Sequence, residues 1–494
     1  MIPTLDGTLE ALSPSEGYAA LGTDFVERRN PTPLTEPHLV ACNPDAASLI
    51  GIGPEQFSRL EFLQLAAGNA RFGSVEPYAA VYAGHQFGQW AGRLGDGRAL
   101  TLGEVRYNGG PFEWQLKGAG ITAFSRFGDG RAVLRSTIRE YLCSEAMAAL
   151  GIPTTRALAI AGGSEPVFRE APETAAVLSR IAPTHVRFGT FEHFHYRGDF
   201  ANVRVLADYV IEHFFPQFAN VDEAEDRYAA FLLEVVRRTA TLIAAWQSVG
   251  FAHGVMNTDN MSIIGLTIDY GPYGFLDAYD AGFICNHTDQ AGRYAFDRQP
   301  TIGLWNLKAL AAALSSLVPF QRAESILTQY ATAFRTEYFR RLREKFGLFS
   351  EHEDDASLIA DALALLQIGA VDHTRFFRNL AALPSREDAG DPIEALLTPR
   401  AAWYAWRSRY RARLLTQDVT DVARKARMNS VNPKFVLRNY LAQEAIQAAQ
   451  RGDYTEISRL HAVLRRPFDE QPESERYADA PPPWASEISV SCSS

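Results

Sequence analysis

The sequence predicts an α+β protein with a small mixed lobe, a larger helical lobe and an extension at each end. Two observations carry this prediction. Residues 66–190 alternate glycine-punctuated strand patterns with a single clear helix, 131–150. From Arg227 onward helical periodicity dominates: one long helix ends at Gly250, and further helices are expected over 304–317 and 323–346. With 494 residues, 47% of them hydrophobic, the chain can bury a large core.

The predicted boundaries follow shifts in composition. The first segment is rich in proline and short apolar clusters, which is typical of an irregular extension laid over a domain. The C-terminal part reads as a helical extension ending in a polar tail. The four predicted regions are an N-terminal extension (1–65), a small lobe (66–190), a helical lobe (191–350) and a C-terminal extension (351–494).

Charge and targeting signals narrow the function classes. A formal net charge of −10, from 48 Lys+Arg against 58 Asp+Glu, argues against nucleic acid or an anionic membrane as the main partner. The first residues lack a basic segment followed by an apolar one, so we expect a cytoplasmic protein. The four cysteines are scattered without a CxxC pair, and this spacing predicts neither a zinc site nor a disulfide scaffold.

A glycine loop begins the candidate chemistry. Gly95 and Gly97 lie in a turn between strand-like segments, where backbone N–H groups can approach phosphate oxygens. A hairpin turn that needs positive φ is the competing interpretation. The loop is followed by a strand ending at Lys117 and then by a helix carrying Glu140. Protein kinases place a phosphate-pairing lysine and its glutamate partner in this order.

The stretch His253–Ser262 resembles a kinase catalytic loop, because His253 and Asn260 have the spacing of the first and last positions of H-R-D-x-x-x-x-N. Asp269, in Asp-Tyr-Gly, replaces the kinase D-F-G aspartate. Asn260 and Asp269 would supply the oxygen ligands of Mg²⁺, with Mn²⁺ as the alternative. Val255 stands where a kinase has its catalytic aspartate.

Val255 cannot take a proton, so ordinary phosphoryl transfer is not expected. Asp259, beside the asparagine, is the predicted replacement base, and a turn-capping aspartate is the alternative interpretation.

Longer runs of sequence resemble the selenoprotein O family (SelO/YdiU type), kinase-like proteins that transfer AMP to protein side chains. The runs include YAGHQFG, LGDGRA, QLKGAG, SRFGDGRAVLRSTIREYL, HGVMNTDNMSI, DYGPYGFLD and NPKFVLRNYLAQ. The resemblance implies a kinase-like fold in which ATP binds inverted, so that its α-phosphate faces a Ser, Thr or Tyr hydroxyl of an acceptor protein. The nucleotide contacts that it implies are Gly95, Gly97, Arg98, Lys117, Asp129, Gly130, Arg180, Arg187 and Asp269.

The alternatives to AMP transfer are UMP transfer from UTP, a phosphotransferase and a non-catalytic nucleotide-binding scaffold. The resemblance also implies redox chemistry at the tail, because some members carry selenocysteine at the position of Cys492. Cys285 lies sixteen residues beyond Asp269, in the region of a kinase activation segment, and is the expected disulfide partner of Cys492; both thiols staying reduced is the alternative.

Overall fold

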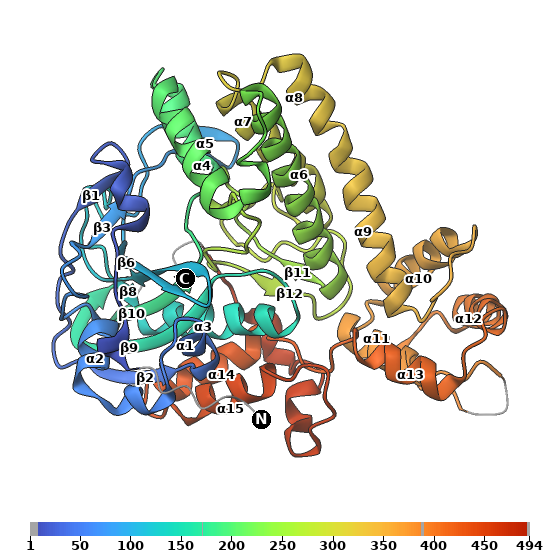
Figure 1. The fold of residues 1–494 in the computed structure, drawn as a ribbon. Coiled ribbons are helices and arrows are strands. Elements are labelled where there is room, and N and C mark those ends of the chain that lie inside the picture. Colours follow the sequence, from blue (N-terminus) through green and yellow to red (C-terminus); the bar gives the residue numbers. More distant parts are fainter. Residues whose placement is uncertain (1–7, 170, 387–389, 492–494) are drawn as a thin grey trace.

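The computed structural model describes residues 8–169, 171–386 and 390–491, and its centre is one antiparallel sheet. Figure 1 shows this sheet on one side of the molecule and a group of helices on the other. In spatial order its strands are β1 (Val26–Arg28), β3 (Tyr78–Ala80), β6 (Ala99–Tyr107), β7 (Gly110–Lys117), β10 (Pro172–Ala182), β9 (Arg156–Phe168) and β2 (His38–Cys42), with β8 (Ala132–Val133) paired to β10.

The two faces of the sheet are covered by different helices, as the alternation of side chains along each strand requires. On β10, Leu178 points to the face that packs on α3 (Leu134–Ala149), whereas Val177 points to the face covered by α2 (Leu60–Ala67). A short helix, α1 (Pro44–Ser48), lies beside α2 on that second face. The sheet is therefore buried on both sides.

Two boundaries differ from the sequence-based prediction. Residues 26–28 and 38–42, expected to be irregular, form β1 and β2 at the two ends of the sheet. The helix expected from residue 131 begins at Leu134, because Ala132 and Val133 pair with β10 instead. Short edge strands carry too few residues to show a two-residue period, which is why the sequence did not reveal them.

The helical part follows the predicted order. The long helix α6 (Ala224–Val249) ends at Gly250, whose φ of 73° gives the left-handed cap that glycine adopts readily. The segment 323–346 holds two helices rather than one, with a break at Thr328. The helices of this part are α4 (Phe188–Tyr196), α5 (Phe200–Phe214), α6, α7 (Gln299–Ala313), α8 (Phe320–Leu327) and α9 (Gln329–Lys345).

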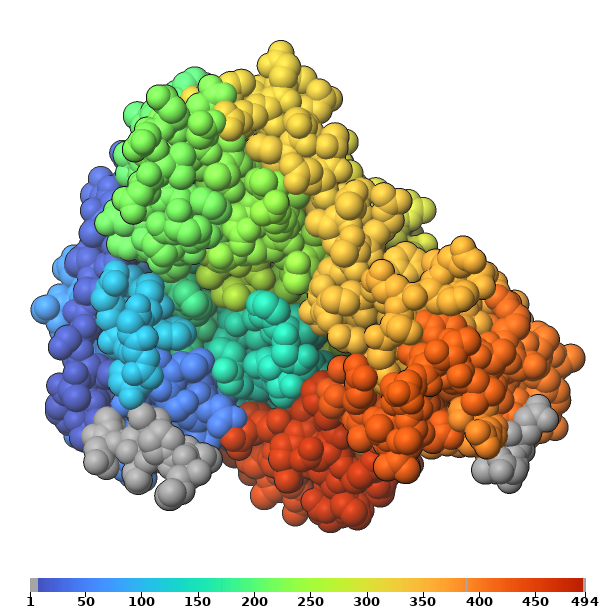
Figure 2. Space-filling model, turned by 45° about the vertical axis from the view of Figure 1, so that its right-hand side comes forward, coloured from blue at the N-terminus to red at the C-terminus, as the bar shows by residue number. Residues whose placement is uncertain are grey.

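The helices of the C-terminal region form two separate groups. One group of helices has its own core and projects at the side of the molecule in Figure 2, and it comprises α10 (Asp355–Gly369), α11 (His373–Leu380), α12 (Arg400–Leu415) and α13 (Asp421–Asn429). The chain then returns to the sheet, where α14 (Asn439–Ala449) and α15 (Thr455–Leu464) pack on α3. In the described part of the chain, no helix combines the length and the hydropathy that crossing a membrane requires.

Two further two-stranded sheets accompany the main sheet. The first is the hairpin of β4 (Gly84–Gln86) and β5 (Gln89–Ala91), and the second pairs β11 (Phe251–Ala252) with β12 (Gly274–Phe275). The second pair brackets the segment 253–273, which carries the catalytic-loop pattern. The same short sheet therefore fixes both ends of that segment.

Candidate active site

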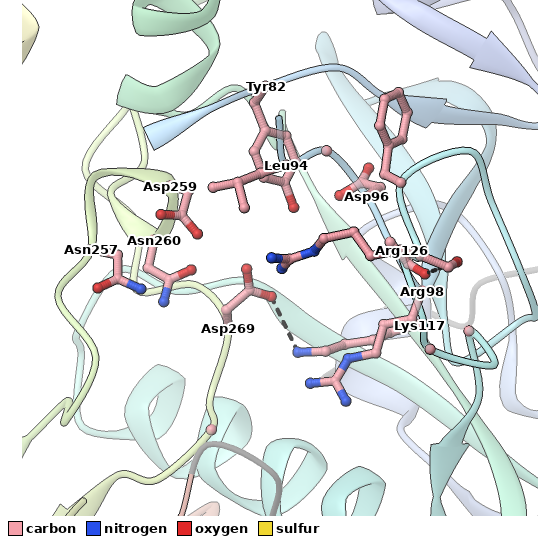
Figure 3. Close-up of a pocket in the computed structure, with 18 of the residues that line it drawn as sticks. Tyr82, Leu94, Asp96, Arg98, Lys117, Arg126, Asn257, Asp259, Asn260 and Asp269 are labelled. Atoms are coloured by element: carbon pink, nitrogen blue, oxygen red, sulfur yellow. Dashed lines mark hydrogen bonds and ion pairs between the residues drawn. The ribbon is translucent and has the colours of Figure 1, made fainter. Parts of the chain in front are cut away.

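A cavity of about 500 Å³ lies between the sheet and the segment 253–273 (Figure 3). It gathers nearly all of the residues predicted from the sequence, from elements far apart in the chain. Those lining it are Gly95, Gly97, Arg98, Lys117, Asp129, Gly130, Arg180, Arg187, Asp259, Asn260 and Asp269. Glu140 lies behind this lining, on α3.

The glycine loop needs its glycines for close packing as well as for conformation. Gly95 has a φ of 99°, and a Cβ on it would come within 2.4 Å of the Phe124 ring. A Cβ on Gly97 would lie 2.9 Å from the Phe124 carbonyl oxygen. The loop is thus pressed against residues 124–125, and its backbone forms one wall of the cavity. Arg98, at the end of this loop, is exposed.

Lys117 and Glu140 form an ion pair, with Nζ 2.5 Å from Oε2. Lys117 is the last residue of β7, and Glu140 is buried on the inner face of α3. Arg180, on the neighbouring strand β10, reaches the same carboxylate: its Nη1 lies 2.8 Å from Oε1 of Glu140. Gln115 accepts two further hydrogen bonds from Arg180. This side of the cavity is therefore a rigid network of buried, paired charges.

Asp269 lies where three cations converge. Its Oδ1 is 3.2 Å from Lys117 Nζ and 2.7 Å from Arg180 Nη1, and Arg187 donates to its Oδ2. Burial alone would raise the pKa of Asp269, but Arg187, Lys117 and Arg180 outweigh burial and hold it well below the usual range. Asp269 has a φ of 59°, an uncommon backbone conformation for a residue other than glycine. The site therefore keeps this carboxylate ionised.

Asp259 has a different environment. It is 7% exposed, and burial raises its pKa to about 6. Its Oδ2 accepts a hydrogen bond from Gln86 Nε2 at 3.1 Å, and its Oδ1 is buried without a hydrogen-bond partner among the described residues. Asp96, Asp129 and Asp269 also line the cavity, and each has an arginine within 4 Å. Within the described residues, Asp259 is the only cavity carboxylate without an ion pair.

The β4–β5 hairpin holds the loop that carries Asp259. The backbone N–H of His85 donates to Thr258 Oγ1 at 2.7 Å, and that of Phe87 donates to Asn257 Oδ1 at 3.1 Å. Gly84 lies so close that a Cβ on it would meet Asp259 Oδ1 at 2.9 Å. The hairpin therefore holds the side chains of Asn257 and Thr258 and packs closely against the Asp259 carboxylate.

Two oxygen-bearing side chains face one another at the bottom of the cavity. Asn260 donates from Nδ2 to the Val255 carbonyl oxygen at 2.9 Å, which turns its Oδ1 away from that bond. Asp269 lies opposite Asn260 in Figure 3. An amide oxygen and an ionised carboxylate are hard donors of the kind that Mg²⁺ prefers, so this pair fits a divalent cation whose other ligands are phosphate and water oxygens.

Asp129 and Gly130 line the cavity from the segment between β7 and β8. Asp129 is exposed and forms an ion pair with Arg169 at 2.8 Å, and this pairing lowers its pKa. Gly130 has a φ of 70°, and a Cβ on it would come within 2.1 Å of the Gly120 carbonyl oxygen, so glycine is needed there. Arg169, Tyr82, Gln86, Arg126 and Asn257 also line the cavity, but sequence reasoning did not select them.

The predicted pairing of Cys285 with Cys492 cannot be followed to its end, because Cys492 lies outside the described residues. Cys285 is 8% exposed, and its Sγ lies 3.5 Å from the carbonyl oxygen of Ala252. Nearby, the backbone N–H of His287 donates to the carbonyl oxygen of Val490 at 2.8 Å. The tail at residue 490 therefore lies beside the segment that carries Cys285, and the disulfide stays a prediction.

A glycine loop, clustered cations and an unpaired carboxylate in one cavity are typical of transferases that use nucleotides. The comparisons with known proteins agree with this class. Residues 9–465 match the family described as "Protein adenylyltransferase SelO". The chain is 53% identical to "Protein nucleotidyltransferase YdiU" of Myxococcus xanthus over 489 residues, covering 99% of this chain and 100% of the relative. The protein of the same description from Thiobacillus denitrificans is 52% identical over 490 residues, with the same coverage.

Matches of this length and identity place the chain in a family: it belongs to the SelO family of protein adenylyltransferases.

Proposed function

We propose that this protein nucleotidyltransferase moves AMP from ATP onto Ser, Thr or Tyr hydroxyls of acceptor proteins, within a kinase-like two-lobed frame. The observation that carries the proposal is the pair formed by Val255 and Asp259. Val255 lines the cavity at the position where a kinase has its catalytic aspartate, and Asp259, four residues on, is the cavity carboxylate without an ion pair. Because the proposed base lies four residues after the kinase position, the acceptor hydroxyl would approach the nucleotide at another point. This favours attack on a phosphorus atom other than the one that a kinase transfers.

In the proposed reaction, Asp259 accepts the proton of the acceptor hydroxyl as its oxygen attacks the α-phosphorus. The new bond joins that oxygen to the α-phosphorus, and the bond between the α-phosphorus and the bridging oxygen breaks. Pyrophosphate leaves with the bonding electron pair, and a phosphodiester remains on the protein. A pKa of about 6 keeps most of Asp259 ionised at neutral pH while leaving it basic enough to share a proton.

Cationic side chains would stabilise the charge that develops on the leaving group. Arg180, Arg187 and Lys117 already converge on Asp269, and their positions are fixed by buried partners before any nucleotide arrives. Such preorganised charges contribute to catalysis because they need not reorient during the reaction. Asn260 and Asp269 would hold the divalent cation, which screens the phosphate charges when it is bound.

The product distinguishes AMP transfer from phosphoryl transfer. We would incubate the protein with ATP and Mg²⁺, isolate the modified acceptor, and treat it either with a phosphomonoesterase or with a phosphodiesterase. The proposal predicts a modification that resists the first enzyme and is removed as AMP by the second. A modification that the phosphomonoesterase removes as inorganic phosphate would contradict it and favour a phosphotransferase.

A further inference from the structure

One side of the cavity is closed by a loop between β7 and β8, residues 121–130, which has two fixed ends. At the first end, Thr122 Oγ1 donates to the Asp96 carbonyl oxygen at 2.7 Å, and Ser125 Oγ donates to the carbonyl oxygen of Gly97. At the second end, the carbonyl oxygen of Gly130 accepts the backbone N–H of Gly120 at 3.1 Å. The loop is therefore attached to the glycine loop and to the end of β7, and only its middle projects.

The projecting part, residues 126–128, is exposed. Arg126 has a φ of 54°, a left-handed conformation that costs roughly 1 kcal/mol or more for a residue with a Cβ. Backbone strain of this kind is found most often at ligand-binding and catalytic sites. In Figure 3 the Arg126 side chain extends from this loop into the cavity, toward the side that carries Asp269.

The ion pairs around the cavity also draw attention to Arg126. The cavity is lined by seven basic side chains, and five of them form ion pairs with carboxylates: Lys117, Arg131, Arg169, Arg180 and Arg187. Arg98 and Arg126 have no ion pair with any described residue. An exposed guanidinium directed into the cavity has its donors available for a ligand.

We propose that Arg126 binds phosphate oxygens of the nucleoside triphosphate, so that the loop 121–130 acts as a cationic clamp over the polyphosphate chain. The proposal deepens the function proposed above, because it assigns a further substrate contact in the same cavity. Lys117, Arg180 and Arg187 share the carboxylates of Glu140 and Asp269, so they leave much of the charge of a bound triphosphate uncompensated. Arg126 and Arg98 supply the missing positive charge from the opposite wall.

The test measures binding of α,β-methylene-ATP, which cannot transfer AMP, by calorimetry in the presence of Mg²⁺. AMP serves as the competitor that lacks the β- and γ-phosphates. The variants are Arg126→Ala, Arg126→Lys and Arg126→Gly, the last of which removes the side chain while suiting the positive φ. Arg93→Ala is the matched control, because Arg93 is an exposed arginine near the glycine loop that does not line the cavity.

The proposal predicts that Arg126→Ala and Arg126→Gly weaken the analogue about tenfold or more, since a charge-assisted contact is lost. AMP affinity should change less than about twofold, Arg126→Lys should recover part of the loss, and Arg93→Ala should resemble the unmodified protein. Analogue affinity within about twofold for Arg126→Gly would overturn the proposal. An equal loss of AMP affinity would also overturn it, because that result assigns the contact to the adenosine or the α-phosphate, which AMP retains, rather than to the rest of the polyphosphate chain. Neither outcome depends on which phosphorus is attacked, so the product analysis above remains a separate test.

Discussion

Asp259 and Asp269 lie in the same cavity, and their surroundings give them opposite properties. Asp269 is surrounded by three cations that hold its pKa well below the usual range, against the effect of burial. Asp259 is less exposed than Asp269 but has a neutral donor, Gln86, and burial raises its pKa to about 6. The difference shows how one site can separate a carboxylate that holds a cation from a carboxylate that accepts a proton.

The largest expected effect comes from Asp269→Asn. This change removes the charge on which Lys117, Arg180 and Arg187 converge and replaces the carboxylate of one proposed metal ligand with a neutral amide. We expect AMP transfer to fall by roughly 10³-fold or more and Mg²⁺-dependent ATP binding to weaken. Lys117 and Arg180 keep their ion pairs with Glu140, but buried Arg187 loses its close carboxylate partner, so the free energy of unfolding at pH 7 should fall by about 3–5 kcal/mol. Transfer within tenfold of the unmodified protein would show that Asp269 does not hold the cation.

Asp259→Asn should separate turnover from binding. We expect kcat to fall by roughly 10²–10⁴-fold, the range of a general base, with ATP affinity unchanged. Calorimetric titration of ATP alongside a transfer assay checks both. Full activity in this variant would return Asp259 to the role of a turn-capping residue.

The same two variants should change stability in opposite directions. The pKa of Asp259 is higher in the folded chain than its ordinary value, so its ionised form opposes folding above pH 6, and this cost vanishes as the pH falls below about 4. Asp259→Asn should therefore raise the free energy of unfolding by about 1–3 kcal/mol at pH 7 and change it little near pH 3. Asp269 has a lowered pKa, so its contribution is present at neutral pH and is lost on acidification. Denaturant titrations at both pH values measure the contrast, and equal effects of the two variants would refute it.

Arg187 links the Asp269 carboxylate to the loop that carries Asp259, because its guanidinium donates to Asp269 Oδ2 and to the backbone carbonyl oxygen of Asp259, the latter at 2.6 Å. Arg187→Lys keeps the charge but loses the planar set of donors, and we expect kcat/KM to fall by about 10–100-fold. Arg180→Lys is the matched comparison, because Arg180 bonds to Asp269, Glu140 and Gln115 and makes no hydrogen bond to Asp259. Unchanged kinetics in both variants would assign the two arginines to structure only.

The smallest effect is expected at Gln86. Its hydrogen bond stabilises the ionised form of Asp259, so Gln86→Ala should raise the pKa of that carboxyl further. Activity requires the ionised base, and the acidic limb of the kcat profile should move to higher pH, by up to about one unit. Gln89→Ala, an exposed residue of the same hairpin, is the control. An unchanged acidic limb of the kcat profile would show that the Gln86 hydrogen bond does not stabilise the ionised form of Asp259.

The sequence revealed those parts of the site that lie in short continuous motifs. Lys117, Glu140, Asp259 and Asn260 stand at spacings set by one strand, one helix and one loop, so their order predicted their proximity. Gln86 could not be found in this way, because it reaches Asp259 through the packing of segments 173 residues apart. Arg126 was also missed, since its selection depends on a positive φ and on the pairing of its neighbours, and neither is visible in a single sequence.

The transferred group is the most direct test of the account as a whole. The protein would be incubated with Mg²⁺ and ATP labelled either at the α-phosphorus or at the γ-phosphorus, with Asp259→Asn in parallel. The account predicts protein-bound label from the α position alone, label from the γ position only in released pyrophosphate, and strongly reduced labelling in the variant. Protein-bound label from the γ position would contradict it, because phosphate rather than AMP would then have moved.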